Sequence, residues 1–193
     1  MYVFNITVLA GDAAATPFDI MTAMNQVYLF TKRLWNTSKI VIGIGGDHAL
    51  TWCLLRAARD FNDGQPVALV HLDSHLDTGD EYHGNKLSHG TALRRAMEDG
   101  CVDVEKSAHI GIHGSMADDT LMKEDTENGW LTITLDEFVQ KGPEGAAEIV
   151  KERIGDDTPT IISFDVDVLE PGECPGIGFP EPGFIVHKYL RHV

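Results

Sequence analysis

Basic residues are scarce in this sequence. Only 15 Lys and Arg stand against 30 Asp and Glu, which gives 193 residues a formal charge of -15. Nucleic-acid binding needs a basic surface that neutralises phosphates, so we expect no nucleic-acid partner. Long hydrophobic runs are also absent, since no stretch approaches the ~18 to 20 apolar residues that span a bilayer. The apolar first ten residues lack the basic segment of a signal peptide. We therefore expect no membrane partner either.

Cysteine is the next scarce residue. The three that occur, Cys53, Cys101 and Cys174, are widely spaced and form no CxxC pattern. An odd and scattered set of this kind favours reduced thiols in a reducing compartment. We expect a cytoplasmic protein, or a mitochondrial one if the true N-terminus lies further upstream.

Apolar residues make up 43% of the chain and charged residues 23%, which is typical of a soluble globular protein. The length suits one domain over residues 1–193. Short β-branched runs alternate with helical patterns, which indicates βαβ crossovers and an α/β, three-layer, doubly wound fold with a mainly parallel sheet. We predict strands at 2–9, 40–44, 67–72, 108–112, 131–134 and 160–164, and helices at 18–35, 49–61, 91–99, 117–125 and 144–154.

Polar clusters follow three of the predicted strands. In a doubly wound sheet, functional residues gather beyond the carboxyl ends of the strands. The first cluster is Gly-Gly-Asp-His, ending at His48. Its Asp47 can equally serve as a helix N-cap, a common role for aspartate.

The second cluster, His-Leu-Asp-Ser-His-Leu-Asp, covers residues 71–77. Asp73, His75 and Asp77 alternate, so an extended backbone would point all three to one side. Two carboxylates and an imidazole converging at a strand end are good ligands for a divalent cation. The alternative is a solvated turn with capping aspartates.

The third cluster is Ser-Phe-Asp-Val-Asp at 163–167, with Asp165 and Asp167 on a shared side. Close carboxylates repel each other unless a cation or a proton lies between them, although such pairs also occur in ordinary turns. Together the clusters offer oxygen and imidazole ligands, which suit Mn²⁺ and leave Zn²⁺, Co²⁺ and Fe²⁺ open. We expect two divalent ions, and the six predicted metal ligands are His48, Asp73, His75, Asp77, Asp165 and Asp167.

The three clusters, in this order and at these spacings, resemble those of the ureohydrolase family, which includes arginase, agmatinase and guanidinobutyrase. The segments Ala-Gly-Asp at 10–12, Pro-Phe-Asp at 17–19 and Leu-Ser-His-Gly-Thr at 87–91 look like the agmatinase side of the family. The resemblance implies the arginase-like version of the fold. It also implies hydrolysis of a small cationic guanidino compound, agmatine first among them, to urea and an amine.

The resemblance also assigns roles to single residues. It implies that His48, Asp73, Asp77 and Asp165 hold one metal, and that His75 and Asp167 share Asp73 and Asp165 with the other. His89 matches a loop histidine that shuttles protons or contacts substrate, Asp167 could also hold the nucleophile, and Glu181 matches a glutamate near the active site. Without the resemblance, His89 is a structural loop residue and Glu181 a solvated acid. Oligomers are usual in the family, so we expect a homo-oligomer.

Several departures from the family pattern weaken the inference from site to activity. A late Glu-Val-x-Pro motif, whose glutamate grips the guanidinium, is not found, and the loop Pro-Gly-Ile-Gly-Phe-Pro-Glu at 175–181 lacks two usual hydroxyls. Residues 184–193 form a divergent tail. We therefore expect a fold that is incomplete relative to the family, truncated at both ends, with exposed strand edges that favour association.

Three functional hypotheses remain open. The first is an agmatinase-like hydrolase, with guanidinobutyrate as an alternative substrate. The second is a metal-binding relative with weak activity or none. The third is a deacetylase of the related fold, which uses one metal, so the additional His48, Asp77 and Asp167 argue against it.

Overall fold

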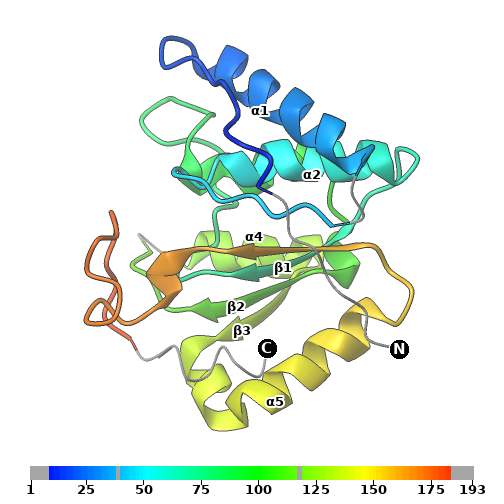
Figure 1. Cartoon of the computed structure of the whole chain (residues 1–193). Coiled ribbons are helices and arrows are strands. Elements are labelled where there is room, and N and C mark those ends of the chain that lie inside the picture. Colours follow the sequence, from blue (N-terminus) through cyan, green and yellow to red (C-terminus); the bar gives the residue numbers. More distant parts are fainter. Residues whose placement is uncertain (1–8, 38–39, 117–118, 184–193) are drawn as a thin grey trace.

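The computed structural model describes residues 9–37, 40–116 and 119–183. Its centre is a four-stranded parallel sheet with the order β3-β2-β1-β4 (Figure 1). The sequence predicts all four strands, and the first begins one residue later than expected. Their bounds are β1 Ala68–Leu72, β2 Ala108–Ile112, β3 Leu131–Thr134 and β4 Thr160–Phe164.

Helices cover both faces of this sheet. On one face α2 (Leu50–Phe61) packs against α1 (Ile20–Trp35) and α3 (Ala92–Glu98). On the other face α5 (Leu135–Ile154) packs against β2 and β3 (Figure 1). This arrangement confirms the three-layer α/β fold with a parallel sheet. The remaining α-helix of the described residues is α4 (Thr120–Asn128), which precedes β3.

Alternate side chains of β1 build two separate cores. Leu69 is fully buried among residues of α2 and α3. Val70 and Leu72 point to the opposite face and pack with Ile110 and with Phe138 of α5. Because β1 is covered on both faces, every one of its residues is buried, as expected for a central parallel strand.

Segment 40–44 was predicted as a strand, and this prediction is wrong. Its three isoleucines are 76 to 97% exposed and its backbone has no ladder partner in the described structure. β-branched residues favour a strand only where a neighbouring strand takes up the backbone hydrogen bonds. Of the other N-terminal prediction, residues 2–8 lie outside the described residues, as does the tail 184–193, and Leu9 has no regular structure.

Three of the five predicted helices match within two residues at each end, and the other two differ by more. The one placed at 117–125 is α4, which covers Thr120–Asn128, and residues 117–118 lie outside the described residues. The one placed at 144–154 is the second half of α5, which begins at Leu135 behind a capping box formed by Thr134 and Glu137. A left-handed Gly142 (φ 73°) kinks α5. The sequence indicates only the second half of α5, because a Gly-Pro pair such as the one at this kink normally ends a helix.

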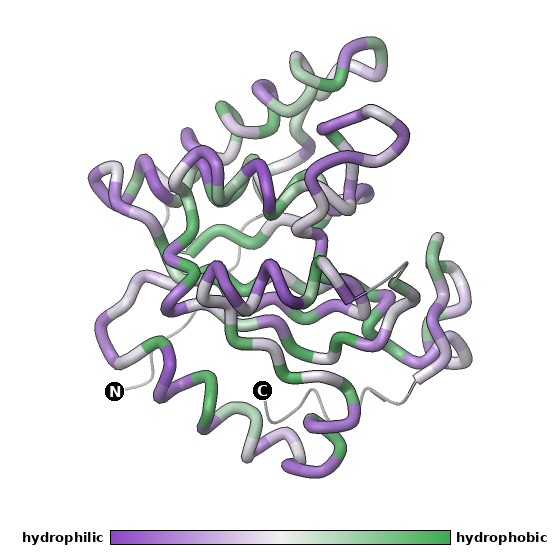
Figure 2. The backbone as a smooth tube through the Cα atoms, turned by 180° about the vertical axis from the view of Figure 1, so that it is seen from behind, coloured by the Kyte–Doolittle hydropathy of each residue, from purple (hydrophilic) through white to green (hydrophobic). Residues whose placement is uncertain are grey.

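Hydrophobic and hydrophilic residues alternate along the helices, as expected for elements with one buried side (Figure 2). Among the described residues, none of the helices has the length and apolar character that a membrane crossing requires.

Candidate metal centre

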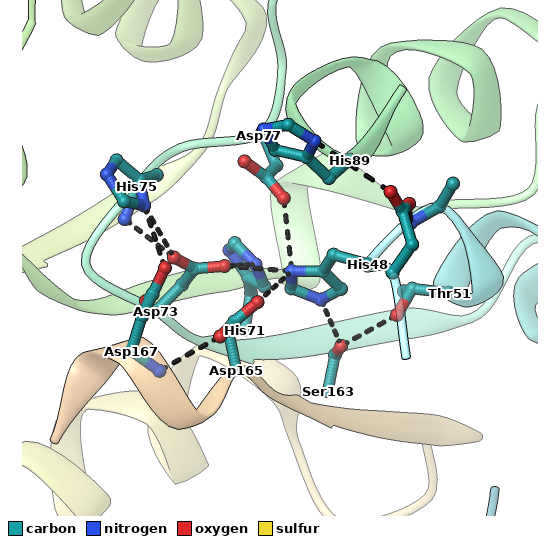
Figure 3. A network of polar contacts seen from close by, with 12 residues as sticks. His48, Thr51, His71, Asp73, His75, Asp77, His89, Ser163, Asp165 and Asp167 are labelled. Carbon is teal, nitrogen blue, oxygen red and sulfur yellow. Dashed lines mark hydrogen bonds and ion pairs between the residues drawn. The ribbon is translucent and has the colours of Figure 1, made fainter. Parts of the chain in front are cut away.

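The three predicted clusters meet at the carboxyl end of the sheet. β1 and β4 pair in parallel with Leu72 opposite Phe164, so the loops that follow them start side by side. The backbone N–H of Asp165 donates to Leu72 O (2.8 Å), and that of Asp73 donates to Ile110 O (3.1 Å). His48 arrives from the turn before α2. Figure 3 shows that the six predicted ligands converge in one polar network.

His48 is the hub of one half of this network. Its Nδ1 lies 3.0 Å from an oxygen of Asp73, 3.0 Å from Asp77 and 3.1 Å from Asp165. On the other side of the ring, Nε2 lies 2.8 Å from Ser163 Oγ. Burial opposes protonation of the imidazole, but the three carboxylates outweigh it and raise the pKa of His48 to about 12. This pocket therefore attracts positive charge strongly.

His75 organises the other half. Its Nδ1 lies 3.0 Å from Asp167 Oδ2 and 3.5 Å from Asp73 Oδ1. Asp167 first and Asp73 second raise the pKa of His75 to about 11, against the effect of burial. Asp167 also accepts hydrogen bonds from the backbone N–H (3.1 Å) and the hydroxyl (2.7 Å) of Ser74, which hold its carboxylate toward the site.

The grouping of ligand atoms matches the expected two-ion arrangement only in part. One group within 4.8 Å contains His48, His71, Asp73 and Asp77, and another contains Asp73, His75 and Asp167. Asp73 belongs to both, as expected of a bridging ligand. Asp165 lies beside His48 but belongs to neither group. The geometry therefore does not support its expected role as a ligand of the second metal ion, the one held by His75 and Asp167.

The residues present fit divalent cations. His48 Nδ1 and Asp73 Oδ2 are buried without a hydrogen bond, which is costly unless another group satisfies them. Burial, and then the neighbouring Asp73, raise the pKa of Asp77, although His48 opposes this. Burial opposes ionisation of Asp73, but its contacts with His71, His48 and His75 outweigh burial and hold the pKa of Asp73 well below its usual range. Buried carboxylates that crowd together in this way are the usual surroundings of a bound cation.

The predicted catalytic residues lie around this centre. Glu181 Oε1 accepts a hydrogen bond from the backbone N–H of Ser115 (3.0 Å) and lies 3.4 Å from His75 Nε2. Chiefly the Ser115 N–H lowers the pKa of Glu181, so the carboxylate is charged. His89 is 3.9 Å from Asp47 and its ring lies 4.9 Å from that of Phe179. His89 touches none of the six predicted ligands in the described contacts.

Asp47 caps the turn before α2, because its Oδ1 accepts the backbone N–H of Ala49 at 2.8 Å. The N-cap residue of α2 is nevertheless Ala49, without a side-chain cap, so Asp47 is not the helix N-cap that the sequence left open. Two hydroxyl residues of the network were given no role from the sequence, Thr51 and Ser163, and their side-chain oxygens are 2.9 Å apart. His71 was noticed without being given a role. Its position two residues before Asp73 in a strand was the available signal, since residues i and i+2 share a face.

Comparison with known proteins decides the family. The Arginase family model matches residues 5–188.

The chain belongs to the arginase family.

Two relatives within this arginase family are a guanidinopropionase from Pseudomonas aeruginosa and a proclavaminate amidinohydrolase from Streptomyces clavuligerus. The first is 37% identical and aligns over 90% of this chain and 54% of the relative. The second is 34% identical, over 93% of this chain and 56% of the relative. The structure of this chain matches the solved structure of the Streptomyces enzyme with a TM-score of 0.85. The match covers 94% of this chain and 59% of the Streptomyces chain.

A Trypanosoma cruzi formiminoglutamase solved with Mn²⁺ shares the arginase-family fold at a TM-score of 0.82 and 22% identity, over 93% of this chain and 59% of that one. This chain thus spans little more than half the length of the relatives it matches.

Proposed function

We propose that this chain holds two divalent metal ions, Mn²⁺ first among them, and hydrolyses a linear guanidino compound to urea and an amine. The observation that carries the proposal is the convergence of six carboxylate and imidazole side chains from three separate segments on one buried centre (Figure 3). Family membership and relatives named for guanidino substrates support it.

Bound ions would supply positive charge that polarises a guanidinium carbon and acidifies a water molecule. The ligands that would hold them are those expected from the sequence, His48, Asp73, Asp77 and Asp165 for one ion and His75, Asp73, Asp165 and Asp167 for the other.

Other parts of the chain would manage the substrate and its protons. Asp167, held by Ser74, has a fixed carboxylate that can accept a proton from the attacking water. His89 at the rim, 3.9 Å from Asp47, can move a proton to the departing amine. Glu181 fixes the ring of His75 and adds negative charge beside the site. These carboxylates favour a cationic substrate over a neutral one.

Among guanidino compounds, we propose agmatine as the first substrate, because its second positive charge suits an acidic rim. Guanidinobutyrate and guanidinopropionate are the alternatives, and they have named relatives at 32% and 37% identity.

A second candidate is a metal-binding relative without turnover. The loop with Ile177 and Phe179 lacks the hydroxyls usual in the family.

One experiment tests both candidates. Metal content is measured by mass spectrometry after Mn²⁺ loading and dialysis, and urea release is measured with agmatine, guanidinobutyrate, guanidinopropionate and arginine. We expect two ions per chain and urea from agmatine. Two ions without urea from any substrate favours the inactive relative, and a folded protein that takes up no metal contradicts both.

A further inference from the structure

A row of aromatic rings lies beside the metal centre. The ring centroids of His89 and Phe179 are 4.9 Å apart, and the ring of Tyr82 lies nearly parallel to that of His89 at 6.4 Å. At the centre itself, the ring of His75 is 6.5 Å from that of Phe179 and nearly perpendicular to it. We call Tyr82, His89 and Phe179 the aromatic row. The row therefore starts next to a proposed metal ligand.

The aromatic row leads from the buried centre toward solvent. All six predicted ligands are buried or partly buried, whereas Tyr82 and Phe179 are exposed. Figure 3 shows His75 and His89 on opposite sides of Asp77, and the ring of Phe179 is in contact with the rings of both histidines. A guanidinium group at the metal ions would extend its tail toward solvent, because the strands and their cores lie behind the centre. The tail would then pass along these rings.

A tight turn holds Tyr82 in this row. Tyr82 and Asn85 exchange two backbone hydrogen bonds, each 2.9 Å long. The Tyr82 ring packs directly on the backbone of Gly90, where an added Cβ would lie 2.6 Å from Tyr82 Cε2. Such a close approach of ring and backbone requires glycine. The turn thus fixes the Tyr82 ring next to His89, the residue that precedes Gly90.

The loop that carries Phe179 is fastened two residues later. The carboxylate of Glu181 accepts hydrogen bonds from the backbone N–H (3.0 Å) and the hydroxyl (3.2 Å) of Ser115. Gly183 lies so close to His113 that an added Cβ would be 2.6 Å from its Nε2. Both contacts tie the loop to the segment after β2. Core packing does not explain the aromatic side chain, because Phe179 is 59% exposed.

Carboxylates lie beside the aromatic row. Asp47 Oδ2 is 3.9 Å from His89 Nδ1, and Glu181 Oε1 is 3.4 Å from His75 Nε2. The face of an aromatic ring attracts a cation, and neighbouring carboxylates add to that attraction. A carboxylate would be repelled by the same acids and would gain nothing from the ring faces. The row is therefore suited to a positively charged group.

We propose that Phe179 determines specificity: its ring, within the aromatic row, binds the cationic tail of a guanidino compound whose guanidinium lies at the metal centre. The preferred substrate class is then a guanidino compound with a second positive charge, ahead of compounds with apolar or carboxylate tails. This inference rests on the proposed function, which places the guanidinium at the metal ions. It concerns binding, so it can be tested whether or not the chain turns the compound over.

The test uses three guanidino compounds of similar length, namely agmatine, butylguanidine and guanidinobutyrate. Their tails end in an ammonium, a methyl and a carboxylate. Dissociation constants for the Mn²⁺-loaded full chain are measured by calorimetry. Phe179→Leu keeps an apolar side chain without a ring, and Phe179→Tyr keeps the ring. Phe61→Leu is the matched control, because Phe61 has a similar exposure (56%) and lies at the opposite end of α2 from His48.

We expect the wild-type chain to bind agmatine most tightly and guanidinobutyrate least tightly. Phe179→Leu should weaken agmatine binding roughly threefold to fivefold, as expected for a cation over an exposed ring, and leave butylguanidine binding nearly unchanged. Phe179→Tyr should retain the agmatine affinity, and Phe61→Leu should change none of the three. Equal losses for agmatine and butylguanidine in Phe179→Leu, or the same agmatine loss in Phe61→Leu, overturn the inference. So does a wild-type chain that binds agmatine no better than the other two compounds.

Metal content and urea release separate this inference from the proposed function. If the chain releases urea from agmatine, the loss in Phe179→Leu should appear in KM and not in kcat, since the ring acts on the tail and not on the reacting carbon. Urea release with an unchanged KM overturns the inference and leaves the proposed function intact. Selective binding without urea from any compound supports the inference and contradicts turnover. A folded chain that takes up no metal overturns both.

Discussion

β1 and β4 lie next to each other in the sheet, pair over five residues and each end in a loop that carries aspartates, yet their surroundings differ sharply. β1 is buried along its whole length, between α2 on one face and α5 on the other. β4 is an edge strand, and Ile162 on the face that α5 leaves open is 69% exposed. The side chain of Asp73 is accordingly 1% exposed and that of Asp165 25%. The centre thus has two walls, the loop after β1, whose Asp73 is set in the core, and the loop after β4, whose Asp165 is partly exposed although Asp167 is buried.

Replacing aspartates in the two walls should give the largest effects. We expect Asp73→Ala to weaken Mn²⁺ binding by more than about 100-fold, beyond the range typical of residues behind a ligand. Asp165→Ala should lose less, since water can reach the position of the more exposed carboxylate. Metal content after dialysis measures both, with the exposed Asp157→Ala as a control. A larger loss in Asp165→Ala would reverse the comparison.

The two strands should also differ in their contribution to stability. Leu69→Ala in β1 removes a fully buried side chain and should lower the free energy of unfolding by about 2 to 5 kcal/mol. Ile162→Ala in β4 removes a largely exposed one and should cost less than about 1 kcal/mol. Urea unfolding of the metal-free chain measures both values. Similar losses would mean that the open face of β4 is covered in solution.

The covered side of the sheet also predicts a pH dependence. Burial raises the pKa of Asp125 to about 6, above its value in the unfolded chain, so the folded protein holds this proton more tightly. The associated stability is fully present below about pH 4, the pKa of the unfolded chain, and is lost as the pH rises through about 6, by roughly 3 kcal/mol. Unfolding free energies between pH 4.5 and 7.5 should fall more steeply in the wild-type chain than in Asp125→Asn. Parallel pH profiles would show that Asp125 titrates normally.

The open side of β4 should cause the smallest effect, weak self-association. Unpaired strand edges with apolar side chains favour contact between copies. Ile162→Lys should reduce association in sedimentation experiments roughly threefold, because a lysine on an edge strand opposes pairing. Val139→Lys, at an exposed residue of α5 (56%), is the matched control and should change little. Equal effects of both substitutions would point to charge in general and not to this edge.

Much of this architecture could be predicted from the sequence, because buried parallel strands appear as short apolar runs and ligands follow their ends. β1 and the Asp-Ser-His-Leu-Asp loop behind it illustrate both signals. Segment 40–44 has the same β-branched composition, but whether it pairs depends on a neighbouring strand that its own residues do not specify. The contacts of His109 with His71 and with Asp125 were also out of reach, because they depend on strand register and on the position of α4.

The strand order carries a consequence for how the chain reaches its folded state. Ser74 and Asp167, which join the two walls by a hydrogen bond, are 93 residues apart in sequence. Contacts between residues so far apart in sequence form late in folding. Bringing them together costs the chain conformational entropy before the contact can compensate for that loss. During synthesis, the ligands behind β1 leave the ribosome well before their partners behind β4. A metal ion whose ligands come from both loops would then bind only after the loops have come together. Its binding would stabilise the folded state and slow separation of β1 from β4.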